Sequence, residues 1–339
     1  TGLVHPNPAS LGLVLAVLIL FAAAGCGGGG RSATPANQHL VYVRGATGAA
    51  ARVWIADGNG AHPRLLTRGF APVLSPDGRS VAVARAHGIY LVSSDGSRER
   101  QLTSRRLRPQ AWSPDGKTLV AATATTLAVV ERRTGRLRVI ARGSLYGFDF
   151  APSGDQLVYS RAPQRTAEGI CGDQFDLYVV PLRGGKPVRI THDGLSAFPA
   201  WGPSRIAFSR FPPGVTIADC SAPGIWTIKP DGSGLQPVIA RAPDEIASLG
   251  YYGLLPVAWL KKDELLVGVR SDAGNQAGVL DTRNRRLRRF GDYVAEPSRD
   301  GRFIVGSGGD QTVSVTITRT QDGRRVFAVQ DACCPDWNR

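Results

Sequence analysis

The sequence is poor in the residue types that carry most enzymatic and metal chemistry. Its 339 residues include five histidines, five cysteines and no methionine. The histidines never fall at a metal-ligand spacing such as His-x-x-x-His, and the cysteines show no paired zinc-type spacing. No Gly-x-Ser-x-Gly segment holds a serine nucleophile, and the glycines at 27–30 lack the strand and Lys-Ser/Thr of a phosphate-binding loop. We therefore expect no catalytic residues, no metal ion and no cofactor.

Long helical patterns and long hydrophobic runs are also missing. No stretch repeats apolar residues with a helical period, and the apolar run at residues 11–24 is too short to cross a bilayer comfortably. The chain is rich instead in turn residues, with 41 glycines and 23 prolines spread along its length. This composition favours many short strands joined by frequent turns, so we predict an all-β protein.

The apolar run near the N-terminus indicates export. It has the length of the hydrophobic region of a signal peptide, and small residues lead from it directly to Cys26. This segment resembles the lipobox of bacterial lipoproteins, in which cleavage leaves the cysteine as an N-terminus that carries enough acyl chain for stable anchoring. We expect residues 1–25 to be a signal peptide, Cys26 to be lipidated and residues 26–37 to be a flexible tether. The alternative is an ordinary secretory signal with an incidental cysteine.

The compartment and the charge bear on the partners. A lipid on Cys26 would place the protein at the cell membrane, facing the periplasm or the extracellular side. The formal net charge of +14 suits an anionic partner, although arginine spread over a solvated surface is the simpler explanation. The densest basic run, residues 283–289, falls on an expected outer strand and lacks interleaved aromatic residues. We expect no nucleic-acid partner, and contact with anionic headgroups or wall polymer is a secondary hypothesis.

A short hairpin recurs along the chain. Ser-Pro-Asp-Gly stands between two apolar runs, which predicts a strand, a tight turn and a second strand. Copies of the motif occupy residues 73–83, 111–122, 148–159, 199–208, 257–267 and 296–305. In the first three copies Pro76, Pro114 and Pro152 follow one another at intervals of 38 residues. Such a fixed period indicates structural repeats.

Each repeat continues with a third strand, a polar turn and a fourth strand. Four short strands in a unit of about 40 residues predict a propeller blade, which must stack on its neighbours to bury both faces. The motifs, with Ser-Pro-Asp-Gly after the first strand and Leu-Thr closing the fourth, resemble the WD-like repeats of TolB-type β-propellers. The resemblance implies a β-propeller domain of four-stranded antiparallel blades over residues 38–339.

The two ends of this domain are expected to share one blade. Residues 39–44 match a second strand with no first strand before them, and residues 333–337 match the missing one. Pairing them would close the ring and leave no open edge. The count is then seven blades, with six, the usual number in TolB-type propellers, as the alternative.

Two repeats carry insertions between their second and third strands. These are residues 162–174, which contain Cys171, and residues 211–224, which contain Cys220. Because the two insertions occupy the same place in adjacent blades, we predict a Cys171–Cys220 disulfide, with two unpaired thiols as the alternative. A third irregular segment, residues 241–254, should emerge on the same face.

The side chains of these segments form a candidate ligand-binding patch, because loops on repeat scaffolds often carry function. The candidates are Arg161, Arg165, Asp173, Arg210, Asp219, Asp244, Glu245, Tyr251 and Tyr252. Solvated loops without a ligand are the alternative. Cys333 and Cys334 should lie near the same face, where they form either a vicinal disulfide or a bond from one of them to an outside thiol.

Two functions fit these features. The favoured hypothesis is a lipid-anchored, non-enzymatic binding or scaffold module for an envelope protein, peptide or glycan. The alternative is a lyase or hydrolase that acts on a polysaccharide at the mouth of the propeller channel, because related repeat folds host such enzymes. The oligomeric state is left open.

Overall fold

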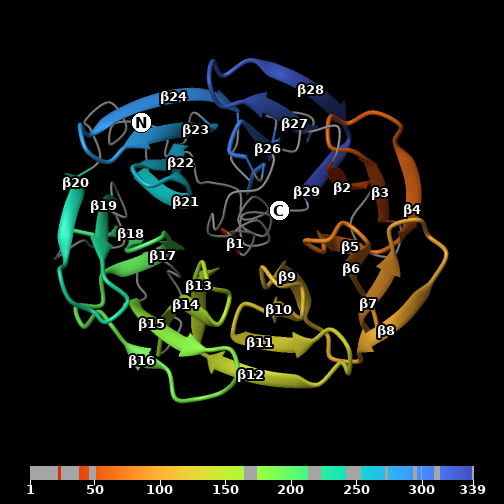
Figure 1. Ribbon diagram of the computed structural model, residues 1–339, viewed down its shortest axis with the longest axis horizontal. Coiled ribbons are helices and arrows are strands. Elements are labelled where there is room, and N and C mark those ends of the chain that lie inside the picture. Colours follow the sequence, from red (N-terminus) through yellow and green to blue (C-terminus); the bar gives the residue numbers. More distant parts are fainter. Residues whose placement is uncertain are drawn as a thin grey trace, which may run out of the picture.

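The structure, a computed structural model, is a ring of seven β-sheets around a common axis (Figure 1). It describes residues 22–23, 38–45, 51–163, 174–212, 223–241, 253–271, 274–292, 296–298, 300–308 and 314–337. All regular elements in these residues are β-strands. The predicted all-β propeller with seven blades is confirmed, and the six-bladed alternative is wrong.

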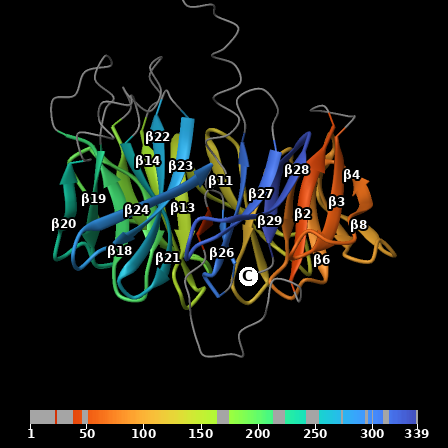
Figure 2. The ribbon, with the colours of Figure 1, turned by 90° about the horizontal axis from the view of Figure 1, so that it is seen from above.

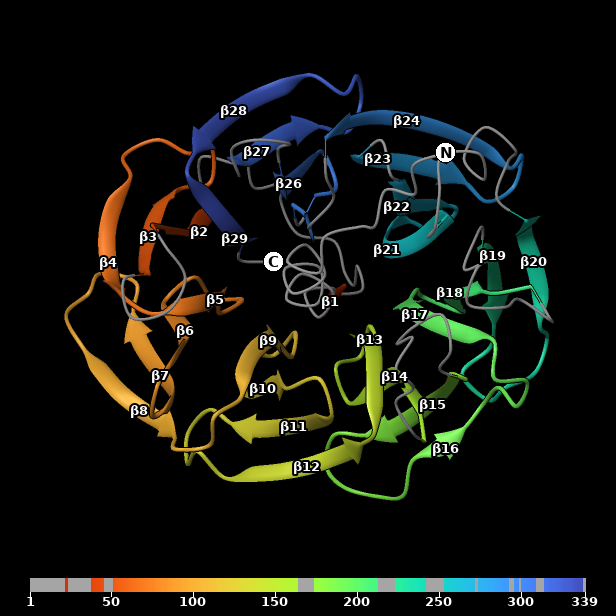
Figure 3. The same ribbon diagram turned by 180° about the vertical axis from the view of Figure 1, so that it is seen from behind.

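The first strand of each blade lies innermost and the fourth outermost (Figures 1 and 3). Blade 1 consists of β29 (Ala332–Trp337), β2 (His39–Arg44), β3 (Arg52–Asp57) and β4 (Arg64–Arg68). Blade 2 consists of β5 (Phe70–Leu74), β6 (Ser80–Arg85), β7 (Gly88–Ser93) and β8 (Glu99–Thr103). Blade 3 consists of β9 (Arg108–Trp112), β10 (Thr118–Ala122), β11 (Thr126–Glu131) and β12 (Leu137–Arg142).

The remaining blades follow in chain order. Blade 4 consists of β13 (Ser144–Phe150), β14 (Gln156–Ala162), β15 (Asp176–Pro181) and β16 (Val188–Arg189). Blade 5 consists of β17 (Ser196–Trp201), β18 (Ile206–Arg210), β19 (Pro223–Ile228) and β20 (Gln236–Arg241). Blade 6 consists of β21 (Gly253–Lys261), β22 (Glu264–Ser271), β23 (Gly274–Asp281) and β24 (Arg286–Asp292). Blade 7 consists of β25 (Glu296–Pro297), β26 (Phe303–Gly308), β27 (Ser314–Arg319) and β28 (Arg325–Gln330).

Blade 1 joins the two ends of the domain. β29 pairs antiparallel with β2, so that Trp337 stands opposite Leu40 and Cys333 opposite Val43. Both Leu40 and Trp337 are fully buried. The predicted closure is therefore confirmed, and the first strand of this blade comes from the far end of the chain.

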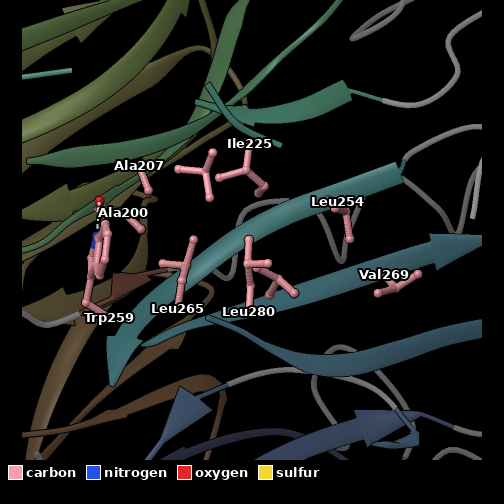
Figure 4. Close-up of a cluster of buried hydrophobic side chains, with 10 residues drawn as sticks. Ala200, Ala207, Ile225, Leu254, Trp259, Leu265, Val269 and Leu280 are labelled. Atoms are coloured by element: carbon pink, nitrogen blue, oxygen red, sulfur yellow. Dashed lines mark hydrogen bonds between the residues drawn. The ribbon is translucent and has the colours of Figure 1, made fainter. Parts of the chain in front are cut away.

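The hydrophobic core lies in the layers between blades, because alternate side chains of a strand face opposite neighbours. In β6, Val81 and Val83 pack against blade 1, whereas Ala82 packs against blade 3. Figure 4 shows the corresponding layer between blades 5 and 6, where Trp259 stands beside Ala200. Each fully buried Leu, Ile or Val side chain stabilises the fold by about 1.5–3 kcal/mol relative to exposure.

The recurring Ser-Pro-Asp-Gly segment is a hydrogen-bonded turn. In blade 2 the hydroxyl of Ser75 and the N–H of Arg79 donate to Asp77 Oδ1 at 2.5 and 3.0 Å, and Ser80 N–H donates to Ser75 Oγ at 3.0 Å. The Ser113 turn of blade 3 and the Ser298 turn of blade 7 repeat these bonds. The segment thus builds a turn between the first and second strands, as predicted.

Among the described residues, side-chain hydrogen bonds join the inner strands of blades 2 and 5 to those of their neighbours. In blade 2 the N–H of Leu74 donates to Asp336 of blade 1 at 2.5 Å, and the carbonyl of Val73 accepts from the Trp112 indole of blade 3 at 3.2 Å. Blade 5 is held in the same way. Its Trp201 N–H donates to Asp149 at 2.6 Å, and its Ala200 carbonyl accepts from the Trp259 indole at 3.1 Å. The arrangement of blades 1 to 3 therefore recurs in blades 4 to 6.

Only two residues before Gln38 are described. β1 (Ala22–Ala23) lies at the centre of the ring and pairs in parallel with Phe148 and Asp149 of β13 (Figures 1 and 3). The expected tether and Cys26 lie outside the described residues. In the described part of the chain, no helix has the length and apolar character needed to cross a membrane.

Candidate functional site

The long connections of blades 4 to 6 begin and end on one face of the ring. We call it the upper face, defined as the face on which each second strand ends and each third strand begins; it lies at the top in Figure 2. In blade 2 only Ala86 and His87 make this connection. The register assigns residues 162–175 to it in blade 4 and residues 211–223 in blade 5. Residues 242–252, which join β20 to β21, start and end on the same face.

Two of the nine candidate ligand-binding residues lie in the described part of the chain. Arg161 is the last residue but one in the second strand of blade 4, and Arg210 ends that of blade 5. Outside the described residues lie Arg165, Asp173, Asp219, Asp244, Glu245, Tyr251 and Tyr252, together with the predicted disulfide partners Cys171 and Cys220.

Arg161 and Arg210 belong to the repeat as well as to the edges of the insertions. In four blades an arginine at or next to the end of the second strand lies over an aromatic ring of the third strand. The ring is two residues further along the chain than the residue paired with the arginine. The distances from guanidinium carbon to ring centroid are 5.4 Å for Arg44–Trp54, 4.6 Å for Arg85–Tyr90, 5.8 Å for Arg161–Tyr178 and 4.5 Å for Arg210–Trp226. Such cation–π pairs stabilise the sheet edge. The sequence does carry a signal for these pairs, which is an arginine at the same position in four of the repeats. Aligning the repeats on their turns alone does not reveal it.

Arg210 is neutralised by an acidic residue from the link between blades 4 and 5. Its Nε and Nη2 donate to Asp193 Oδ2 at 2.9 and 2.6 Å. Burial raises the pKa of Asp193, but the hydrogen bonds from Arg210 and from the Leu195 N–H, with the arginine charge, outweigh it and hold the pKa below its usual value. Arg210 is thus held between a carboxylate and the ring of Trp226.

Arg85 of blade 2 is also paired with a carboxylate. Its Nη1 and Nη2 donate to the two oxygens of Glu99 at 2.5 and 2.7 Å, and its Nε donates to the carbonyl of Arg68 at 2.9 Å. The hydrogen bond from Arg85 is the main reason why the pKa of Glu99 is lowered. Each nitrogen of this guanidinium therefore has at least one acceptor.

Arg161 has no such partner. It makes no hydrogen bond or ion pair with the described residues, and its Nε is buried without an acceptor. The side chain passes close to Gly143, where a Cβ atom would lie 3.2 Å from Arg161 Nε and 2.5 Å from the carbonyl oxygen of Ala162. Below it, burial raises the pKa of Tyr159 to about 12, so that phenol is uncharged near neutral pH.

A buried carboxylate not anticipated from the sequence lies close to the upper face. Asp176 begins β15 and accepts hydrogen bonds from the Thr191 hydroxyl at 3.0 Å, the Gly194 N–H at 3.2 Å and the guanidinium of Arg189. Because its oxygens are occupied, Asp176 fastens the end of blade 4. The sequence held no local signal for it, since the three donors come from β16 and from the segment that follows it, 13 to 18 residues further along the chain.

Cys333 and Cys334 are half-buried free thiols on β29, packed against the layer between blades 1 and 2. Cys334 has a φ of 57° and precedes a proline, as do Ala71 in blade 2 and Phe198 in blade 5, whose φ values are 48° and 53°. The hydrogen bond between the thiols lowers the pKa of Cys333 and raises that of Cys334. The pair thus occupies the regular bulge of an inner strand, and the vicinal disulfide stays a prediction.

The described histidines lie in or directly after three different blades, which are blades 1, 2 and 4. His62 Nδ1 lies 2.8 Å from Asp57 in blade 1, and His192 Nδ1 lies 2.7 Å from the carbonyl of Thr191 after blade 4. Among the residues that the structure describes, no group of three or more His, Cys, Asp or Glu side chains could hold a metal ion.

Comparison with known proteins gives likenesses of structure only. No family model matches the chain, and no curated protein matches it. TolB from Acinetobacter baumannii superposes with a TM-score of 0.54 at 14% identity, covering 90% of this chain and 67% of that one. An oligogalacturonate lyase in complex with manganese gives 0.55 at 17% identity, covering 86% and 85%.

The β-propeller domain of the Trilobed protease from Pyrococcus furiosus gives a TM-score of 0.57 at 13% identity, covering 92% of this chain and 97% of that one. It is described as having an open velcro topology, whereas β29 and β2 close the ring here. At these identities the likenesses show the fold alone. The chain therefore has the β-propeller fold that TolB and these other proteins share, in a closed seven-bladed form.

Proposed function

We propose that this chain is a lipid-anchored β-propeller of the bacterial cell envelope that binds a protein, peptide or glycan through its upper face. The observation that carries the proposal is the one-sided placement of the long connections. All three belong to the adjacent blades 4 to 6 and share the upper face. The opposite face carries the short, hydrogen-bonded turns of the repeat, which are Ser-Pro-Asp-Gly in blades 2 and 3 and Ser-Arg-Asp-Gly in blade 7.

A rigid framework supports these connections. Blade 5 is tied to both neighbours through its inner strand, and Arg210 and Asp176 fasten the roots of its insertion and of that in blade 4. Loops that project from such a scaffold form binding surfaces without changing the fold below them. The lipid anchor rests on the sequence around Cys26, and it would keep the binding face close to the membrane.

Grafting a short turn into the insertions tests the proposal. Ala86-His87 of blade 2 replaces residues 163–174 in one variant and residues 212–222 in another. Pull-down from detergent-solubilised membranes with the full chain should recover a partner that at least one graft abolishes. The same graft in place of residues 309–313 of blade 7 is the matched control and should leave recovery unchanged.

If all three graft variants recover the partner equally, the upper face of blades 4 and 5 is not the binding site. Mass spectrometry of the extracted protein without reduction belongs to the same experiment. It should find acylated Cys26 as the N-terminal residue, and an uncleaved, unmodified N-terminus would contradict the anchor.

A second function is favoured by one finding, the likeness to an oligogalacturonate lyase in complex with manganese. On that hypothesis the chain is an enzyme that cleaves an acidic polysaccharide at the mouth of the propeller. Metal analysis of the purified protein, together with an assay for unsaturated products from polygalacturonate, separates the two functions. Cleavage of polygalacturonate at the same rate in the wild type and in both graft variants would favour the enzymatic function.

A further inference from the structure

We propose that the upper edge between blades 3 and 4, at Arg161, binds a carboxylate side chain of an acidic peptide segment. This inference rests on the proposed function and specifies the chemistry that the binding face recognises. It comes from a comparison of four positions that the repeat makes equivalent: Arg44, Arg85, Arg161 and Arg210.

Two of the four positions show what this arrangement binds. Arg85 holds both oxygens of Glu99, and Arg210 holds Oδ2 of Asp193, while each guanidinium lies over an aromatic ring. The two acids reach the arginine from different elements, Glu99 from the fourth strand of the same blade and Asp193 from the link between blades. The common feature is therefore the carboxylate itself, because a planar guanidinium matches its two oxygens.

Arg161 offers the same arrangement without an acid. The ring of Tyr178 supports the guanidinium, and the phenol of Tyr159 beside it is uncharged near neutral pH. Among the described residues neither Arg161 nor the exposed Arg142, next to Gly143, has an ion-pair partner. Counting the described residues alone, the place that Glu99 and Asp193 fill in the other blades has a net positive charge here.

The burial of Arg161 separates it from Arg44, the other position without a carboxylate. Arg44 is half-buried, but none of its nitrogen atoms is buried without a partner, so water can solvate the group. Arg161 instead has a buried Nε–H with no acceptor among the described residues, which costs free energy. Its Nη1 and Nη2 are not among the buried atoms and have no described acceptor, so a bound carboxylate would reach these two nitrogens and neutralise the charge.

A peptide carboxylate fits these observations better than other anions. The two internal examples are an aspartate and a glutamate on polypeptide chains, at distances of 2.5–2.9 Å from guanidinium nitrogens. The protein carries a net charge of +14, which would attract an acidic segment to this edge over longer range. An acidic glycan, whose uronate groups also carry carboxylates, is the competing ligand in the test.

The test measures binding of an N-acetylated, amidated hexaglutamate peptide to the full chain in detergent by calorimetry. Hexaglutamine and hexagalacturonate serve as comparison probes. We expect Arg161→Gln to weaken hexaglutamate binding about tenfold, because one charge-assisted, two-point contact is lost. Arg85→Gln is the matched control, since Glu99 already occupies that guanidinium, and it should change the affinity by less than about twofold.

Three results would overturn the proposal. In the first, the wild type and Arg161→Gln bind hexaglutamate with the same affinity. In the second, hexagalacturonate binds the wild type more tightly than hexaglutamate does, and Arg161→Gln abolishes that binding. A double variant, Glu168→Gln with Asp173→Asn, could bind hexaglutamate about tenfold more tightly, which would mean that acids of this chain already fill the site. A melting temperature equal to that of the wild type shows in each case that the variant is folded.

The pull-down described above distinguishes this inference from the function on which it rests. If Arg161→Gln loses hexaglutamate but still recovers the partner, the carboxylate site is real and the partner uses other contacts. If the grafts have no effect while Arg161→Gln loses hexaglutamate, the binding-face proposal fails and the carboxylate site stands.

Discussion

Trp112 and Trp259 each use an indole N–H to hold the preceding blade. Both side chains are buried, and both donate to a carbonyl of the neighbouring inner strand. Blade 4 has Phe150 at the same register, fully buried, so a phenyl ring fits this layer. Tryptophan at this position therefore provides a specific link between blades in addition to hydrophobic surface.

We predict that Trp112→Phe lowers the free energy of unfolding by about 1–3 kcal/mol, because the buried carbonyl of Val73 loses its donor. Urea unfolding followed by circular dichroism measures the change. Trp226→Phe, at a half-buried ring on a third strand, serves as the control and should cost less. If Trp112→Phe is as stable as the wild type, the indole bond does not hold the blades together.

At the scale of elements, β29 is the strand that closes the ring. It supplies the inner strand of blade 1 and the buried Trp337, and its Asp336 accepts the N–H of Leu74 in blade 2. One short strand thus joins blade 1 internally and ties it to blade 2. The other inner strands are held to their own blades by a tight turn, whereas β29 depends on non-local pairing.

Removing the carboxylate of Asp336 should weaken this junction. Asp336→Ala leaves the buried Leu74 N–H without its acceptor, and we expect a loss of about 1–3 kcal/mol in the free energy of unfolding. Asp331→Asn, at an exposed neighbouring residue, is the control. Hydrogen exchange should show faster exchange in β29, β2 and β5 for Asp336→Ala. Unchanged exchange there would contradict the assigned role of this carboxylate.

At the scale of the whole molecule, the turns determine how the protein responds to acid. Burial raises the pKa values of Asp77, Asp115 and Asp300, but hydrogen bonds from the turn serines and backbone N–H groups outweigh it and leave all three lowered. A carboxyl whose pKa is lower in the folded state stabilises the fold above its unfolded value, near 4, and loses that effect as the pH falls through the folded value.

We therefore predict that the free energy of unfolding changes little between pH 7 and about 5 and falls steeply below about pH 4. The net charge of +14 rises further as acids protonate, which adds repulsion in the same range. Urea unfolding at a series of pH values measures the profile. Asp115→Asn should flatten it, and stability lost mainly between pH 7 and 5 would contradict the assignment to these aspartates.

The sequence by itself determined the local structure of this protein. The Ser-Pro-Asp-Gly turns and the strands beside them follow from interactions within about forty residues, because a turn and its flanking strands are specified by neighbours in the chain. Even the closure of blade 1 was predictable, since residues 39–44 matched a second strand that lacked its first.

Only the tertiary structure decided how the repeats differ from one another. The links from Asp336 to Leu74 and from Asp149 to Trp201 join residues of different blades, and no local pattern marks them. The same holds for Arg85 and Arg161, which occupy equivalent positions near the ends of their strands. Glu99 reaches the first from the fourth strand of the same blade, whereas no acid among the described residues reaches the second.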